Sequence, residues 1–172
     1  MNPKINQLMN EFADHHTHLQ IWCYQTASLA NDLGFPGASK WFLVQAQDEV
    51  LHTRKIYNYL LGRDEKIIPK IAMPSDYNKY NATSLLQIFE DYKKLKLEFI
   101  AHTTNLIKSS QETNDFLTVK FLDWFLIDFY EEVEQATDYI DMIKMSNNDL
   151  YGFNKLLNKR AEPDTLKVIV PY

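Results

Sequence analysis

Apolar side chains recur every three or four residues along four long stretches of the chain, and this spacing is typical of amphipathic helices. The first predicted helix covers about residues 4–33, and Gly34 supplies a natural helix end. Its apolar stripe consists of Ile5, Leu8, Phe12, Leu19, Trp22, Leu29 and Leu33. The second covers about residues 37–61, and Gly62 follows it. Its stripe consists of Phe42, Ala46, Ile56 and Leu60.

Two further helices are predicted in the second half of the chain. The third begins at a capping box formed by Ser84 and Gln87, whose side chains can satisfy backbone donors of the first turn. Its stripe consists of Leu85, Ile88, Tyr92, Leu95, Phe99 and Leu106. The fourth begins near Thr113 or Asn114, because either side chain suits an N-cap. Its stripe consists of Leu122, Phe125, Phe129, Ala136, Ile140 and Ile143.

The connection between the second and third helices, residues 63–82, has two prolines and no clear period. It is too long for a tight turn, so it is predicted to cross the bundle from end to end. A short fifth helix is predicted over about residues 149–160, and the tail, residues 161–172, has no predicted structure. The expected fold is an all-α four-helix bundle over about residues 4–145, in a single domain of residues 1–172.

The composition excludes several classes of protein. The net charge of -5 and the pI near 5.5 argue against a nucleic-acid partner. No long uncharged apolar run is present, and the first residues lack the apolar core of a signal peptide, so we expect a cytoplasmic protein with no membrane partner. A single cysteine, Cys23, excludes an intrachain disulfide, and the four glycines form no phosphate-binding loop.

Side chains that commonly bind metals interrupt the apolar stripes near the middle of the helices. Glu49 continues the stripe of the second helix, and His52 follows three residues later, so both point the same way. Glu132 continues the stripe of the fourth helix. In the first helix, at least one of His15 and His16 must face inward. The pattern therefore predicts a polar cluster inside the bundle.

Two interpretations of this cluster remain open from the residues alone. A buried carboxylate without a partner costs several kcal/mol or more, and proteins tolerate that cost mainly for a metal or for catalysis. Glu-x-x-His on one helix, with carboxylates from facing helices, is a recurring way for a bundle to hold iron or manganese. The alternative is a buried salt-bridge cluster of Glu49, Glu132 and Lys96, which borders the core on the third helix.

The chain resembles a bacterial non-haem ferritin from about Leu8 to Leu157. The resemblance rests on GASKWFLVQAQDEVLH at 37–52, the segment 84–93, FLDWF at 121–125 followed by Glu131 and Glu132, and LYGF at 150–153. It implies a ferritin-like bundle in a hollow shell of 24 subunits that stores ferric mineral. It also implies iron without haem, and a dinuclear ferroxidase centre where oxygen or peroxide oxidises two ferrous ions.

Part of that centre carries over to this chain by position. The resemblance implies that Glu49 is the glutamate shared by the two metals, that His52 is its histidine partner, and that Glu132 is a further carboxylate. The departures are His16 and Lys96 in place of two glutamates, Phe129 in place of a glutamine, and Cys23 in place of a tyrosine.

These departures change the expected chemistry. His16, Glu49 and His52 remain a suitable ligand set for one metal, since imidazole and carboxylate both suit iron and zinc. Lys96 brings an ammonium where the second metal would need a carboxylate, and it can pair with Glu49 and Glu132. We therefore expect one weakly bound metal at most, and slow coupled oxidation if the centre acts as a ferroxidase.

A second iron site is implied toward the inner surface of the shell. Its positions carry over as Asp48, Asp128 and Glu131, and Asp48 replaces a longer side chain. The alternative for these residues is a solvated acidic face, which would still attract ferrous ions and seed mineral.

Three functional hypotheses follow from the sequence. The first is an iron-storage ferritin with an altered ferroxidase centre. The second is a protein whose iron sequestration limits hydroxyl-radical damage with little storage. The third is a metal-free bundle whose buried charges only stabilise the fold.

Overall fold

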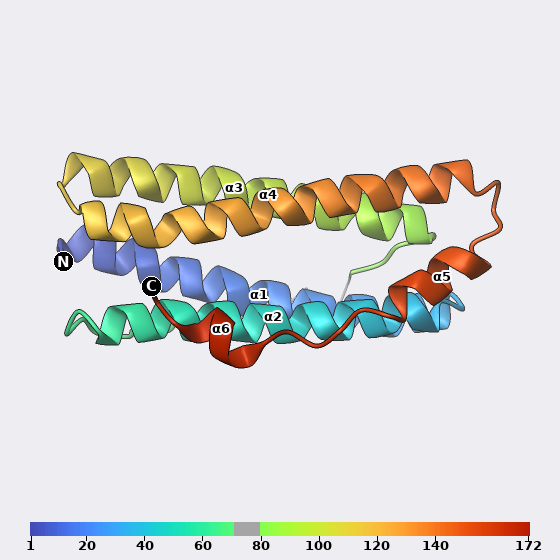
Figure 1. Ribbon diagram of the computed structural model, residues 1–172, viewed down its shortest axis with the longest axis horizontal. Helices are drawn as coiled ribbons and strands as arrows, with labels where there is room; N and C mark the ends of the chain where they lie inside the picture. The colour runs from blue at the N-terminus through green and yellow to red at the C-terminus, as the bar shows by residue number, and fades with distance from the viewer. Residues whose placement is uncertain (71–79) are drawn as a thin grey trace.

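The computed structural model describes residues 1–70 and 80–172, and within them four long helices lie side by side (Figure 1). They are α1 (Pro3–Asp32), α2 (Pro36–Leu61), α3 (Leu85–Glu112) and α4 (Phe116–Met145). Two short helices follow, α5 (Tyr151–Leu157) and α6 (Thr165–Ile169). The predicted all-α four-helix bundle with a short fifth helix is confirmed. The fifth helix is shorter than predicted, and α6 was not predicted.

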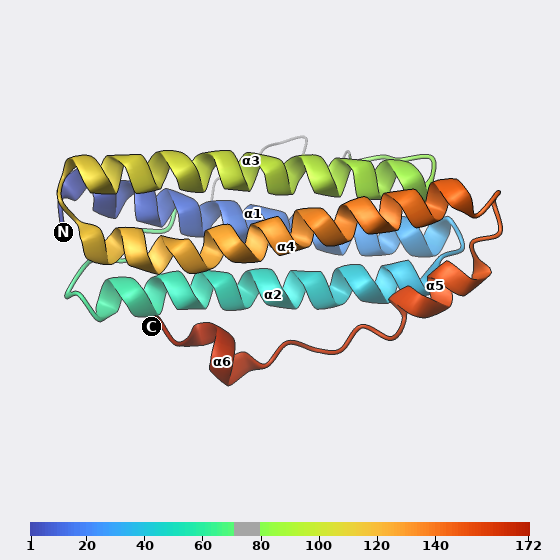
Figure 2. The ribbon, with the colours of Figure 1, turned by 45° about the horizontal axis from the view of Figure 1, so that its top comes forward.

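The four helices form two antiparallel pairs. The backbones approach most closely between α1 and α2 and between α3 and α4. The chain leaves α2 at the end of the bundle where the N-terminus lies and enters α3 at the opposite end (Figure 2). The predicted end-to-end crossover is therefore confirmed, although residues 71–79 of that connection lie outside the described residues.

Short polar side chains fix the starts of α3 and α4. The predicted cap of α3 is present, because Ser84 Oγ accepts a hydrogen bond from the backbone N–H of Gln87 at 3.2 Å. The predicted start of α4 at residues 113–114 is wrong. Asn114 has a φ of 55° in the left-handed region, so the chain reverses there before the helix begins. Asp115 is the N-cap instead and accepts from the backbone N–H of Thr118 at 3.2 Å.

Helix α5 supplies the cap that the start of α2 lacks. Phe35, the residue before α2, makes no capping bond with its side chain. Asn154 of α5 accepts hydrogen bonds from the backbone N–H groups of Gly37, at 2.8 Å, and Ala38, at 3.2 Å. The approach depends on Gly37, because a Cβ at that position would lie 1.9 Å from the Asn154 carbonyl oxygen.

The tail, residues 161–172, had no predicted structure, and it runs back from α5 along α2 (Figures 1 and 2). Polar side chains of α2 hold its main chain. Asn58 Nδ2 donates to the carbonyl of Ile169 at 3.0 Å, and the Lys55 ammonium donates to the carbonyl of Val170. The tail therefore lies against α2, outside the four-helix bundle.

The predicted apolar stripes meet in one core. Fully buried aromatic side chains come from every long helix and include Phe12, Phe42, Phe89 and Phe125. Within residues 1–70 and 80–172, no helix is both long and apolar enough to span a membrane.

We expect Gly37→Ala to lower the free energy of unfolding by about 2 kcal/mol, because the added methyl group would force α5 away from the start of α2. The matched control is Gly152→Ala, on α5 itself, where an added Cβ meets nothing within 4 Å. Urea or thermal unfolding of the two variants measures the difference. Equal stability of both variants would contradict the close docking of α5.

Candidate metal centre

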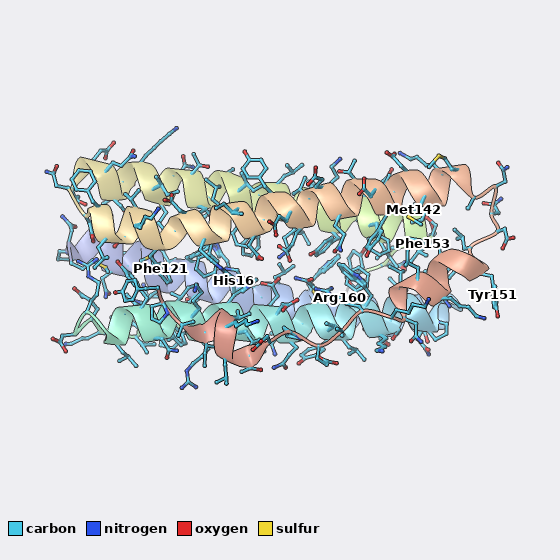
Figure 3. All side chains as sticks on the ribbon, viewed as in Figure 1. His16, Phe121, Met142, Tyr151, Phe153 and Arg160 are labelled. Atoms are coloured by element: carbon cyan, nitrogen blue, oxygen red, sulfur yellow. The ribbon has the colours of Figure 1, made fainter. Side chains whose placement is uncertain are left out.

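Five ionisable side chains converge inside the bundle, and each long helix contributes at least one. They are His16 on α1, Glu49 and His52 on α2, Lys96 on α3 and Glu132 on α4. His16, Glu49 and Lys96 have 0% exposed surface. Along the long axis of the bundle in Figure 3, His16 lies between Phe121, toward one end, and Phe153 and Met142, toward the end where α5 lies. The structure thus brings together the polar residues that interrupt the apolar stripes.

Glu49 lies at the middle of this cluster and uses both carboxylate oxygens. Oε2 lies 2.6 Å from Nδ1 of His16 and 3.5 Å from Nδ1 of His52. Oε1 lies 2.7 Å from Nζ of Lys96. Burial raises the pKa of Glu49, but the Lys96 charge and the hydrogen bonds from the histidines outweigh burial and hold that pKa well below its ordinary value. Glu49 is therefore ionised in the core.

Lys96 joins the carboxylates of two facing helices. Its Nζ lies 2.7 Å from Oε1 of Glu49 and 2.6 Å from Oε2 of Glu132. Burial lowers the pKa of Lys96, yet the two carboxylates raise it above the ordinary value. The ammonium is therefore a permanent positive charge between them. It occupies the position where the resemblance to ferritins implies a carboxylate beside the second metal.

Gln45 and Tyr92 donate further hydrogen bonds to the glutamates, and neither was predicted as a site residue. Gln45 Nε2 donates to Oε1 of Glu49 at 2.8 Å and to Oε1 of Glu132 at 2.7 Å. The Tyr92 hydroxyl donates to the same oxygen of Glu132 at 3.1 Å. Gln45 could have been found, because it lies one helical turn before Glu49 and therefore on the same face.

The histidines provide donor atoms for a cation. Burial lowers the pKa of His16 to about 3, so its imidazole is neutral, and Nδ1 carries the proton that it shares with Glu49. Ligand atoms of His16, Glu49 and His52 all lie within 4.8 Å of one another. Neutral imidazole and carboxylate suit iron and zinc as ligands, and Nε2 of His16 is buried with no hydrogen-bond partner among the described residues. The residues therefore fit one metal ion, whereas a second would need the place of Lys96.

The three residues predicted for an inner-surface site have separate surroundings. Asp48 Oδ2 accepts from Nη2 of Arg160 at 2.6 Å, and Asp128 Oδ2 lies 3.4 Å from Nε2 of His52. Glu131 is exposed on α4. Among the described residues, they do not form a cluster as close as that of His16, Glu49 and His52. Their role as an iron site remains a prediction.

The remaining two departures are not ligands in this arrangement. The Phe129 ring is fully buried, and its centroid lies 5.6 Å from that of His16 and 5.2 Å from Nζ of Lys96. Cys23 is fully buried, and burial raises the pKa of its thiol well above the ordinary value, so the thiolate that binds metals is disfavoured.

Known proteins resemble this chain in sequence and in fold. The Ferritin-like domain family model matches residues 5–146. A bacterial non-heme ferritin of Staphylococcus saprophyticus is 27% identical over 164 residues, which cover 94% of this chain and 96% of that protein. Another, of Staphylococcus haemolyticus, is 28% identical over 159 residues and covers 91% of each chain. The open pore ferritin of Archaeoglobus fulgidus has a similar fold, with a TM-score of 0.87 at 22% identity over 94% of this chain and 99% of that one.

We expect Lys96→Met to destabilise the metal-free protein by about 3–5 kcal/mol, because it leaves two carboxylates in the core without their cation. Added Co²⁺ or Zn²⁺ should recover much of this loss by replacing the ammonium. Chemical unfolding with and without the metal measures both effects.

The matched control is Lys144→Met, which breaks the exposed pair of Lys144 with Glu90 and should change stability by less than about 0.5 kcal/mol. If metal-free Lys96→Met were as stable as the control, the ion pairs of Lys96 would not offset the cost of burying charge on Glu49 and Glu132, and the prediction would be wrong.

Proposed function

We propose, from the premise that this chain belongs to the ferritin-like family, that it is an iron-storage ferritin. In this proposal 24 copies form a hollow cytoplasmic cage that takes up Fe(II) and holds it as ferric mineral, without haem. The family match and the four-helix bundle support the storage role. The observation that carries the rest of the proposal is the position of Lys96 between Glu49 and Glu132.

We infer that the centre binds one ferrous ion weakly. His16, Glu49 and His52 supply its ligands, and the Lys96 ammonium takes the place of a second cation. Reduction of oxygen to peroxide needs two electrons, whereas one ferrous ion supplies one. A one-ion centre therefore oxidises iron slowly, and most iron would be oxidised elsewhere in the cage.

Acidic residues outside the cluster are the proposed place for that oxidation. Asp128 Oδ2 lies 3.4 Å from Nε2 of His52, at the edge of the cluster. Glu131 is exposed on the same helix, α4. In the proposed cage, these carboxyls collect ferrous ions and seed the mineral.

A second candidate function rests on the satisfied state of the buried charges. Both oxygens of Glu49 have protein partners, so the charge of this glutamate is balanced without a metal. That observation favours a protein whose centre has no metal function. Such a cage would still sequester iron at its acidic surface and limit hydroxyl-radical damage.

Ferrous oxidation in air by the metal-free protein, at about two irons per subunit, tests the proposed centre. We expect the wild type to oxidise iron little faster than a protein-free blank. We expect Lys96→Glu to be faster than the wild type by about tenfold or more, because it restores a carboxylate for the second ion. A wild-type rate well above the blank would contradict the one-ion centre.

The proposed cage is tested by sedimentation of the full chain. We expect a mass near 24 times that of the 20.3 kDa chain. Growth of a ferric core inside such a particle would support storage, whereas poor loading with clear suppression of hydroxyl radicals would support protection. A monomer or dimer would contradict both cage functions.

A further inference from the structure

Arg160 lies in the C-terminal segment, residues 158–172. It contacts Gln45, which in turn donates to Glu49 and Glu132. It lies after α5, where the chain turns back along α2 (Figure 3). Its Nη2 donates to Oε1 of Gln45 at 2.7 Å and to Oδ2 of Asp48 at 2.6 Å. Its Nη1 donates to the backbone carbonyl of Trp41 at 3.2 Å, and the guanidinium lies 4.2 Å from the centroid of the Trp41 ring. Four contacts therefore fix Arg160 on α2.

The bond from Arg160 decides which way the Gln45 amide faces. The amide has one acceptor and one donor end. Because Arg160 can only donate, the oxygen of Gln45 must face it, and Nε2 must then face the bundle interior. There Nε2 donates to Glu49 and Glu132. A flipped amide would place its oxygen against two carboxylates and its N–H groups against a guanidinium, so Arg160 and the two glutamates together exclude the flipped state.

The orientation of Gln45 affects the affinity of the centre for cations. As held, Gln45 donates hydrogen bonds to Oε1 of both glutamates, which reduces the negative charge that a cation at Oε2 of Glu49, beside the histidines, would meet. A released amide could turn its oxygen toward the cluster and act as a neutral metal ligand. Arg160 also neutralises Asp48, which lies one residue before Glu49.

We propose that Arg160 is a positioning residue of the centre, which holds Gln45 as a donor to Glu49 and Glu132 and so keeps divalent cations weakly bound. This inference rests on the proposed function only in that it takes the cluster of His16, Glu49 and His52 to be a metal site. The C-terminal segment is then part of the centre, although it lies outside the four-helix bundle.

Titration of the full-length, metal-free protein with Co²⁺ tests this role, with calorimetry and the absorption of the bound ion as readouts. Arg160→Ala should bind Co²⁺ about tenfold more tightly than the wild type, since changes in the partners of metal ligands alter affinity on that scale. Arg160→Lys, which keeps the charge and a donor, should return most of the way to the wild-type affinity.

Two further variants separate positioning from other effects. Lys159→Ala removes a neighbouring positive charge from an exposed residue of the same segment and should leave the affinity unchanged. In a Gln45→Leu background there is no amide to orient, so adding Arg160→Ala should give no further gain. Circular dichroism of each variant checks that the helices are intact.

The outcomes distinguish this inference from the proposed function. If Arg160→Ala binds Co²⁺ as the wild type does while His52→Ala binds it less tightly, the positioning role is overturned and the metal site stands. A gain that persists in the Gln45→Leu background, or that Lys159→Ala reproduces, also overturns it. If neither the wild type nor Arg160→Ala binds Co²⁺, the positioning role and the metal site are both overturned.

Discussion

The interior of this bundle depends on one ammonium group held between two carboxylates. Glu49 and Glu132 come from facing helices, and either charge alone in the core would be costly. Lys96 balances both without any bound ion, and Gln45 and Tyr92 satisfy oxygens that it leaves over. The buried carboxylates are thus balanced by a cation that belongs to the chain itself.

The periodicity of apolar residues was sufficient to predict the four long helices, because burying a stripe of side chains dominates helix packing. It was also sufficient to predict that Glu49 faces the core, because Glu49 continues a stripe. Lys96 was predicted only at the edge of the core, whereas it is fully buried. The start of α4 was misplaced, because Asp115 and its neighbours 113–114 are all good capping residues. Only the positive φ of Asn114, where the backbone reverses, leaves Asp115 as the N-cap.

Other features could not be predicted, because they depend on contacts between distant parts of the chain. Arg160 lies at the end of the predicted fifth helix, but its contact with Gln45 arises only because the chain returns along α2 after α5. The same return path pairs it with Asp48, which the resemblance to ferritins implied as a possible iron ligand. The capping of α2 by Asn154 is equally non-local, since Phe35 gives no local sign of a missing cap.

The tail is bound to α2 through its main chain. Lys55 and Asn58 bind main-chain carbonyls at Val170 and Ile169, groups that every residue type provides. Most tail side chains are thus free to vary without loss of these bonds, whereas Arg160 makes its contacts with its own guanidinium. Among relatives that keep this path, the tail should diverge in sequence while its course is retained. A single arginine would then mark the register in which the tail lies on the bundle.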